Sequence, residues 1–229
     1  MTSVLITGAN RGIGLALAET YIERGARVLA TCRAPERAKE LDRLARSNPS
    51  LRVAPLDVTD PSSVAGAAAA LDDRPLDILI NNAGVISPDR QTGLDMDFDG
   101  WAHAFAVNTM GPLRVAQALI ANLRASANGR IVTITSAMGS STSASGYNLA
   151  YRSTKAAGNR VMQGLASDLR GAGIIVVVVH PGWVRTAMGG RGAPLGARDS
   201  AAGLYAVIDR LTVTDSGGFF DVDGRKVPW

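Results

Sequence analysis

The sequence predicts an α/β fold: a doubly wound, parallel, seven-stranded sheet flanked by helices in three α/β/α layers. Short apolar, β-branched segments alternate with longer helical patterns along the 229 residues, which is the rhythm of βαβ units that feed a parallel sheet. The segment 174–179 is apolar at every position, as a strand covered on both faces must be. A chain of this length with 46% hydrophobic residues can bury one sizeable core, so we expect a single domain over residues 1–229.

The expected elements alternate strictly between strands and helices. Gly25 and Gly171 stand where C-terminal helix caps are needed. Two small-residue stretches, 139–146 and 189–196, have no apolar period and are expected to be loops at the carboxyl edge of the sheet, where such folds bind ligands. Strands are expected at 3–6, 27–32, 52–56, 78–81, 130–135, 174–180 and 218–221, and helices at 13–24, 35–46, 62–71, 98–124, 150–170 and 200–210.

Composition argues against several classes of protein. The 24 basic and 20 acidic residues give a net charge of +4, but the charges are scattered, which favours an ordinary surface with a few phosphate-binding arginines over nucleic-acid binding. Cys32 has no partner for a disulfide, and His103 and His180 lie far apart in the sequence, so no metal site is expected. No apolar stretch approaches the roughly 18 residues of a membrane span. The start of the chain reads as strand and turn rather than signal peptide, so we expect a cytoplasmic protein.

The segment 7–14, TGANRGIG, joins the first expected strand to the first expected helix. Its glycines, Gly8, Gly12 and Gly14, allow a tight turn and the close approach of backbone amides to a pyrophosphate. The spacing Gly-x-x-x-Gly-x-Gly differs from the Gly-x-Gly-x-x-Gly fingerprint, so an ordinary glycine-rich turn remains the alternative. The position between strand and helix favours a dinucleotide cradle.

Tyr151 and Lys155 stand four residues apart in an expected helix, so they lie on one helical face within reach of each other and of a shared ligand. A neighbouring ammonium favours the phenolate, so we expect Lys155 to lower the phenol pKa from about 10 by about 3 pH units, or roughly 4 kcal/mol. Tyr151 then becomes a usable acid/base near neutral pH. The pair alone is a weak signal, because this spacing also occurs by chance.

Further motifs accompany this pair in a fixed order. Asp57-Val58, Asn81-Asn82-Ala83-Gly84, Ser136 and Pro181-Gly182 follow or end the third to sixth expected strands, and Asn108 stands in the long helix. Together with the glycine turn and Tyr151 to Lys155, this set resembles the short-chain dehydrogenase/reductases over the length of the chain. Within that family, Cys32-Arg33, 181–186 and 217–221 resemble the C-factor and sniffer-like carbonyl reductase subgroup.

The resemblance implies a Rossmann-type fold and an oxidoreductase that transfers a hydride between NADP(H) and a carbonyl or alcohol substrate. Tyr151 would exchange the proton, Ser136 would hydrogen-bond the carbonyl oxygen, Lys155 would hold the nicotinamide ribose and Asn108 would help hold a water on the proton path. Backbone groups near Val184 and the hydroxyl of Thr186 would bind the carboxamide. The catalytic set is Asn108, Ser136, Tyr151 and Lys155. The cofactor-binding set is Gly8, Asn10, Arg11, Gly12, Ile13, Gly14, Arg33, Asp57, Val58, Asn81, Ala83, Gly84, Tyr151, Lys155, Pro181, Gly182, Val184 and Thr186.

Some of these positions also have a purely structural interpretation. Asp57 could only cap the turn that follows it, although the family counterpart meets the adenine ring, and Asn81 could be a satisfied turn residue without ligand contact. Ser136 is preferred to Ser140 and Ser141 as the catalytic serine, because it ends a strand and a glycine follows three residues later.

The substrate pocket is expected to lie beside the catalytic residues. Tyr147 has no lysine four positions on, so it is assigned to the pocket rather than to the chemistry. Trp183 and Met188 follow Pro181-Gly182 and are expected to flank the substrate, although packing explains them equally well. The expected pocket residues are Met138, Tyr147, Trp183 and Met188.

NADP(H) is expected rather than NAD(H). In a Rossmann unit the residue that ends the second strand lies beside the adenosine ribose, where an acid would repel the 2′-phosphate. This strand ends at Cys32 and Arg33 without an acid. Arg33 offers a planar fork of donors suited to phosphate, and Arg11 could approach from the other side. The alternative is that both arginines only face water.

Two rival functions remain open at this point. A nucleotide-binding sensor or signalling protein would keep the fold and the cofactor, but it would not need a positioned acid. An isomerase or dehydratase on the same fold usually has a longer chain with an added substrate region. We therefore expect an NADP-dependent enzyme acting on a small carbonyl or alcohol, without nucleic-acid or membrane partners, and assembled as a homodimer or homotetramer because the long helices are rich in apolar residues.

Overall fold

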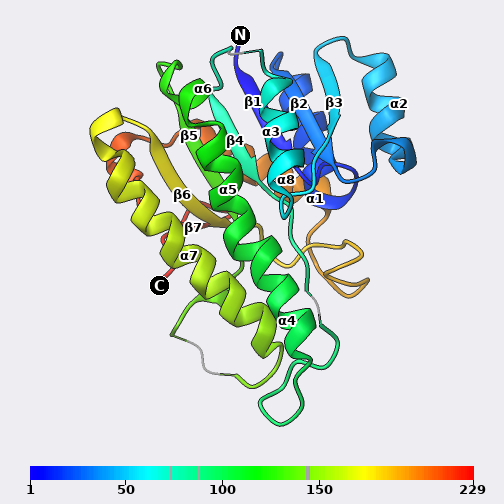
Figure 1. Cartoon of the computed structure of the whole chain (residues 1–229), viewed down its shortest axis with the longest axis vertical. Coiled ribbons are helices and arrows are strands. Elements are labelled where there is room, and N and C mark those ends of the chain that lie inside the picture. Colours follow the sequence, from blue (N-terminus) through cyan, green and yellow to red (C-terminus); the bar gives the residue numbers. More distant parts are fainter. Residues whose placement is uncertain (73, 87, 143–144) are drawn as a thin grey trace.

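Seven parallel strands form one sheet in the order β3-β2-β1-β4-β5-β6-β7. The computed structural model describes residues 1–72, 74–86, 88–142 and 145–229. Because the strand order reverses between β1 and β4, the carboxyl ends of these two strands flank the topological switch point, where doubly wound sheets bind ligands. The strands are β1 (Ser3–Thr7), β2 (Arg27–Cys32), β3 (Leu51–Pro55), β4 (Ile78–Asn81), β5 (Arg130–Ile134), β6 (Ile175–His180) and β7 (Phe219–Asp221) (Figure 1).

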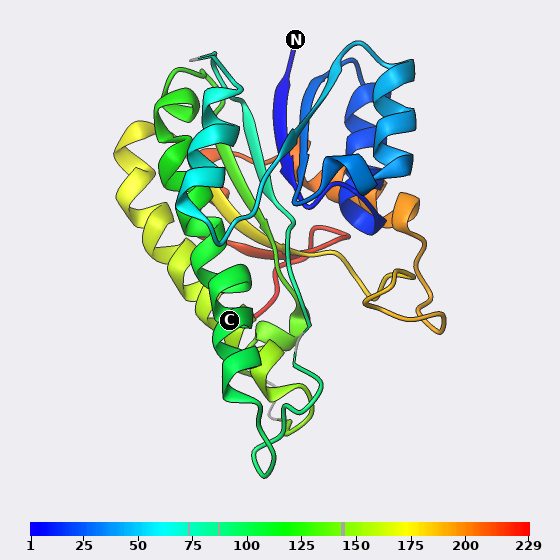
Figure 2. The ribbon, with the colours of Figure 1, turned by 45° about the vertical axis from the view of Figure 1, so that its right-hand side comes forward.

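Helices cover both faces of this sheet (Figure 2). One face carries α1 (Gly12–Glu23), α2 (Lys39–Ser47) and α8 (Ala197–Asp209). The other carries α3 (Pro61–Ala69), α4 (Phe98–Phe105), α5 (Gly111–Ala118), α6 (Ile120–Arg124) and α7 (Leu149–Leu169). This three-layer arrangement confirms the predicted fold class. Among the described residues, none of the helices has both the length and the apolarity needed to cross a membrane.

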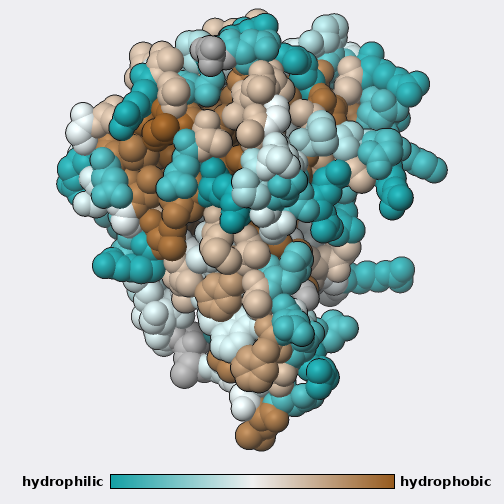
Figure 3. All heavy atoms as spheres, in the orientation of Figure 1, coloured by the Kyte–Doolittle hydropathy of each residue, from teal (hydrophilic) through white to brown (hydrophobic). Residues whose placement is uncertain are grey.

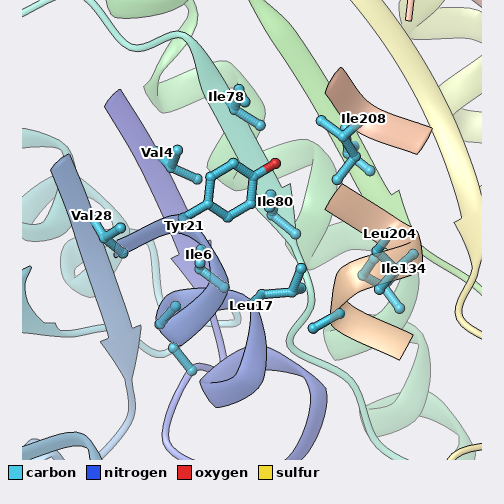
Figure 4. Packing of buried hydrophobic residues seen from close by; sticks show 14 of the residues in the cluster. Val4, Ile6, Leu17, Tyr21, Val28, Ile78, Ile80, Ile134, Leu204 and Ile208 are labelled. Carbon is cyan, nitrogen blue, oxygen red and sulfur yellow. The ribbon is translucent and has the colours of Figure 1, made fainter. Parts of the chain in front are cut away.

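The strand β6 is covered by helices on both faces, which explains why residues 174–179 are all apolar. Val177 and Val179 pack into the core beneath α1 and α8, while Val176 and Val178 pack beneath α5 and α7. Successive side chains point to opposite faces of a strand, so a central strand must be apolar at every position. On the α1 and α8 side, Tyr21 lies among aliphatic side chains from β1, β4 and α8 (Figure 4).

The expected continuous helix 98–124 is wrong in one respect, because the structure divides it. A π-helical turn, Ala106–Met110, separates α4 from α5, and Leu119, with φ −104° and ψ 5°, separates α5 from α6. Pro112 at the start of α5 lacks an N–H group and so cannot continue a regular ladder. Single π turns inside helices occur frequently at functional sites, and this one contains Asn108.

Candidate active site

The glycine turn between β1 and α1 lies against two other loops at the carboxyl edge of the sheet. Gly8 has φ +66°, and a Cβ atom there would lie 2.9 Å from the Cα of Ala83. Gly12 has φ +57°, and a Cβ atom there would lie 3.2 Å from Cγ2 of Thr186. Side chains are therefore excluded at both positions, which leaves backbone at the surface of the turn, as a pyrophosphate cradle requires.

Asn82, which the sequence analysis did not assign to the site, holds this turn in place. Its Nδ2 donates hydrogen bonds to the carbonyl oxygens of Thr7 at 2.9 Å and Gly8 at 3.0 Å. A Cβ atom on Gly14 would lie 2.5 Å from that Nδ2. The Asn81-Asn82-Ala83-Gly84 motif indicated that an asparagine lies near the turn. Which of the two asparagines faces the turn depends on the strand register, which the sequence does not give.

Asn81 faces the opposite way. Its side chain is 2% exposed and donates to the carbonyl oxygen of Pro112 at 3.3 Å and to Oγ1 of Thr133 at 3.4 Å. The Asn81 amide nitrogen thus ties β4 to β5 and α5, while its buried Oδ1 has no hydrogen-bond partner among the described residues.

Ser136, Tyr151 and Lys155 come together between β5 and α7. The hydroxyl of Ser136 lies close enough to the Tyr151 phenol to lower its pKa, against the larger effect of burial. Nζ of Lys155 donates to the carbonyl oxygen of Ile134 at 2.9 Å, two residues before Ser136. All three side chains are buried. The fold thus brings a hydroxyl beside a phenol and an amine that follow it by 15 and 19 residues in the sequence.

The prediction that Lys155 lowers the pKa of Tyr151 is wrong. Burial raises the pKa of Tyr151 to about 12, and the hydrogen bond with Ser136 opposes this only in part. Burial also lowers the pKa of Lys155 to about 8. The physical reason is that low-dielectric surroundings disfavour the charged form of both groups, an effect that sequence spacing does not reveal.

Asn108 links the π turn to the segment after β4. Its Oδ1 accepts from the Val85 N–H at 2.9 Å, and its Nδ2 donates to the Val85 carbonyl at 2.8 Å and to Oγ1 of Thr154 at 3.0 Å. A Cβ atom on Gly84 would lie 3.2 Å from Asn108 Oδ1 and 3.6 Å from Lys155 Nζ. Asn108, Gly84 and Lys155 are therefore neighbours, as expected, and the Asn108 side chain holds the loop beside them.

Asn159 is a second residue that the sequence analysis missed. It lies four residues after Lys155, on the same face of α7, and is 3% exposed. Its Oδ1 accepts from the Thr135 hydroxyl at 2.6 Å, and its Nδ2 donates to the Gly139 carbonyl at 3.2 Å. These bonds hold the chain on both sides of Ser136, so Asn159 fixes the position of the serine.

The ends of β2 and β3 supply the charged side of the site. Arg33 is exposed at the end of β2, and Arg11 is exposed at the start of α1. Oδ1 of Asp57 accepts from the N–H and hydroxyl of Thr59 at 2.9 Å and 2.6 Å. The Thr59 hydroxyl is the main cause of a lowered Asp57 pKa, to which the charge of Arg33 also contributes. The Asp57 side chain thus caps its own turn, within the electrostatic reach of Arg33.

The remaining cofactor candidates occupy the expected loops. Asn10 and Ile13 are half-buried in the glycine turn. Val58 is buried, and its carbonyl oxygen accepts from Nη1 of Arg114 at 2.7 Å. Pro181 is fixed through its carbonyl oxygen, which accepts from the buried hydroxyl of Ser200 at 2.7 Å.

The segment after β6 folds back on itself. Gly182 has φ +82°, and Val184 forms a bridge with Leu195. The Thr186 hydroxyl accepts from the Gly189 N–H at 3.0 Å. Consequently Val184 and Thr186 are held within a closed loop that lies beside the glycine turn.

The expected pocket residues surround this edge but are largely open to solvent. Tyr147 is 70% exposed, Trp183 60% and Met188 44%, while Met138 is half-buried and donates its N–H to Oγ of Ser136 at 3.1 Å. Trp183 is oriented by a hydrogen bond from its Nε1 to the Gly189 carbonyl at 2.8 Å. Of the four, Met138 is the one joined directly to a catalytic candidate.

A separate cavity of about 450 Å³ opens at the opposite, amino edge of the sheet, where Tyr21, Arg24, Asp77 and Arg130 line it. Ligands of doubly wound sheets bind outside the carboxyl ends of the strands. The candidate site is therefore the carboxyl edge, where the glycine turn and the buried hydroxyl pair meet, and not this cavity.

The fold and this site together define a Rossmann-type α/β protein with a dinucleotide-type turn beside a buried serine, tyrosine and lysine. The sequence model of the short chain dehydrogenase family matches residues 2–193. The chain therefore belongs to the short-chain dehydrogenase family of oxidoreductases, which confirms the resemblance inferred from its motifs.

Individual relatives agree with the narrower subgroup. The chain is 46% identical over 156 residues to the C-signal protein of Myxococcus xanthus, covering 68% of this chain and 93% of that protein. The NADPH-bound carbonyl reductase from chicken fatty liver superposes with a TM-score of 0.94 at 35% identity, covering 100% of this chain and 99% of that one. The carbonyl reductase Sniffer of Drosophila melanogaster superposes with a TM-score of 0.95 at 30% identity, with full coverage of both chains.

Proposed function

We propose that this chain is an NADP(H)-dependent carbonyl reductase in which Tyr151 is the general acid/base, assisted by Ser136 and Lys155. The observation that carries the proposal is the burial of Ser136, Tyr151 and Lys155 together at the carboxyl edge of the sheet, with Lys155 one helical turn after Tyr151 in α7. A buried phenol beside a hydroxyl and an amine, at the sheet edge where ligands bind, is better suited to proton transfer than to packing.

The residues present fit a dinucleotide. Side chains are sterically excluded at Gly8 and Gly12, so backbone amides would meet the pyrophosphate, and Arg33 and Arg11 would meet the 2′-phosphate. Lys155 would hold the nicotinamide ribose, and Val184 and Thr186 would bind the carboxamide. Carbonyl reductase structures with bound NADPH or NADP share this fold at 31–35% identity, which supports the same cofactor here.

The protonation states favour reduction at neutral pH. The bound nicotinamide supplies the hydride. Tyr151, with a pKa of about 12, is protonated at neutral pH and can give its proton to a carbonyl oxygen that Ser136 also hydrogen-bonds. Lys155, with a pKa of about 8, is mostly charged at neutral pH and stabilises the phenolate that this transfer leaves.

The experiment that tests the proposal measures NADPH oxidation by the purified protein against a panel of aldehydes, ketones and quinones. Turnover by the wild type with at least one of these carbonyls, and its loss in Tyr151→Phe, is the expected result. NADPH binding without turnover of any substrate would instead support the sensor function. The buried Tyr151 favours an enzyme over a sensor, because a binding module does not need a buried acid.

A further inference from the structure

We propose that Gln91 is a positioning residue that caps the catalytic helix α7 from the loop after β4 and so fixes Tyr151. The inference rests on the proposed role of Tyr151. It concerns a residue that lies 60 positions away from that tyrosine in the sequence and outside the motifs that identify the family.

Asn148, the residue before α7, does not cap the helix with its side chain. Tyr151 is the third residue of the helix, so its N–H group has no acceptor within the helix. A capping residue normally accepts from this third N–H through its own side chain. Here the residue before the helix, Asn148, has φ +54° and makes no such side-chain hydrogen bond.

Gln91 supplies the acceptors that cap the first turn of α7. Its Oε1 accepts from the Tyr151 N–H at 3.0 Å, and its backbone carbonyl accepts from the Leu149 N–H at 3.0 Å. Two of the otherwise unpaired donors in the first turn of α7 are thereby satisfied by one residue. Removing such a cap interaction destabilises the first turn of a helix.

The other end of the Gln91 amide is fixed as well. Nε2 donates to the carbonyl oxygens of Ile86 at 2.9 Å and Pro88 at 2.6 Å, and the side chain is 6% exposed. A buried amide with both ends bonded has one orientation. Since Ile86 follows the segment that Asn108 holds through Val85, Gln91 connects the cofactor side of the site to the backbone of the catalytic tyrosine.

The consequence is that the position of the Tyr151 phenol depends on Gln91. The first turn of a helix frays when its N–H groups are unpaired, and Tyr151 must remain within hydrogen-bond reach of Ser136. Loss of the Gln91 acceptor should therefore lower kcat more than it weakens NADPH binding, because the glycine turn is not touched.

The test follows the Tyr151 amide directly. The chain has four tyrosines, so ¹⁵N-tyrosine labelling gives four amide signals, and Tyr151→Phe identifies the relevant one. In Gln91→Met we expect hydrogen exchange at the Tyr151 amide to be about tenfold faster than in wild type. Tyr21 and Tyr205, in α1 and α8, serve as internal controls.

Thr92→Val is the matched control, since Thr92 is exposed in the same loop and its hydroxyl bonds to Asp95. If Gln91→Met does not fold, Gln91→Asn replaces it, because the side chain shortened by one methylene cannot reach the Tyr151 N–H. Unchanged Tyr151 exchange in these variants, or equal acceleration in Thr92→Val, would overturn the inference. Absence of turnover in the wild type would refute the proposed function, while the exchange result still decides the cap.

Discussion

Nζ of Lys155 lies 5.8 Å from the centroid of the Tyr151 ring, and its hydrogen bond goes to the Ile134 carbonyl at 2.9 Å. The two catalytic candidates thus share a helical face, but burial governs both titrations. The pKa of the phenol rises to about 12, and that of the ammonium falls to about 8.

Tyr151→Phe should lower kcat by roughly 100-fold to 10,000-fold, the usual contribution of a positioned acid/base. Removal of one hydroxyl leaves the ring and the packing of α7 intact, so the dissociation constant for NADPH should stay within about twofold. Steady-state kinetics and fluorescence titration of NADPH measure the two quantities. A variant that keeps most of its turnover would rule out Tyr151 as the proton donor.

Lys155 should make the protein more stable as the pH rises above about 8. Its pKa is about 8 in the folded chain, against an ordinary value of 10.5. Between these values the unfolded chain binds more protons than the folded chain, so the free energy of unfolding increases with pH. From about pH 7.5 to about pH 9.5, Lys155 should contribute a gain of about 2 kcal/mol.

Lys155→Met tests this sign, because it removes the titrating group and keeps an apolar side chain of similar length. Urea unfolding of both proteins at the two pH values isolates the lysine from every other group that titrates in the window. The difference in unfolding free energy, wild type minus variant, should become more favourable to the wild type at the higher pH. A difference that does not change with pH would contradict the buried, pKa-lowered lysine.

Arg33 should determine the preference for NADPH over NADH. A charge-assisted hydrogen bond contributes roughly 1.5 to 3 kcal/mol, so Arg33→Ala should weaken NADPH binding by about one to two orders of magnitude and leave NADH binding nearly unchanged. The double variant Cys32→Asp, Arg33→Ala should prefer NADH. Equal affinities of the wild type for both cofactors would refute the assignment, as would a double variant that still prefers NADPH.

Gly14→Ala should weaken NADPH binding by at least about tenfold. The new Cβ would lie 2.5 Å from both Asn82 Nδ2 and the Gly8 carbonyl, so the turn must shift. Gly66→Ala is the control, because Gly66 lies in α3 with nothing within 4 Å of its Cβ position. That substitution should leave binding unchanged and stabilise the fold by about 0.5 to 1 kcal/mol. Isothermal titration and thermal unfolding measure both effects.

We predict that the chain is a homodimer or homotetramer. The helix residues Ala104, Val107, Val115 and Leu119 are buried within the subunit. Hydrophobic side chains nevertheless gather over α5, α6 and α7 (Figure 3), where Leu113, Ile120, Val161 and Leu165 are only partly buried. Light scattering should give a multiple of 23.8 kDa. A monomer at micromolar concentration would refute this.

The loop 187–197 carries a prediction about dynamics. Its four glycines permit many backbone states, and in the structure the loop is tied by the bridge between Val184 and Leu195 and by the bond from Trp183 to Gly189. NADPH should slow its hydrogen exchange further, because cofactor contacts restrict the backbone. Equally slow exchange with and without NADPH would contradict this.

The sequence by itself determined the features that depend on local periodicity. Alternating apolar runs predicted the parallel sheet, the glycines at 8, 12 and 14 predicted the turn, and a spacing of four placed Tyr151 and Lys155 on one face of α7. These features could be predicted because strand and helix periods are fixed by backbone geometry.

Only the tertiary structure decided what depends on burial and on contacts between distant residues. It showed that burial sets the Tyr151 pKa, that a π turn interrupts the long helix at Asn108, and that Asn82, rather than Asn81, holds the glycine turn. It also placed Gln91 against the backbone of Tyr151, 60 residues away. A pKa depends on the dielectric around the group. A helix cap from a distant segment depends on which loop reaches the end of the helix. Neither is a local property of the chain.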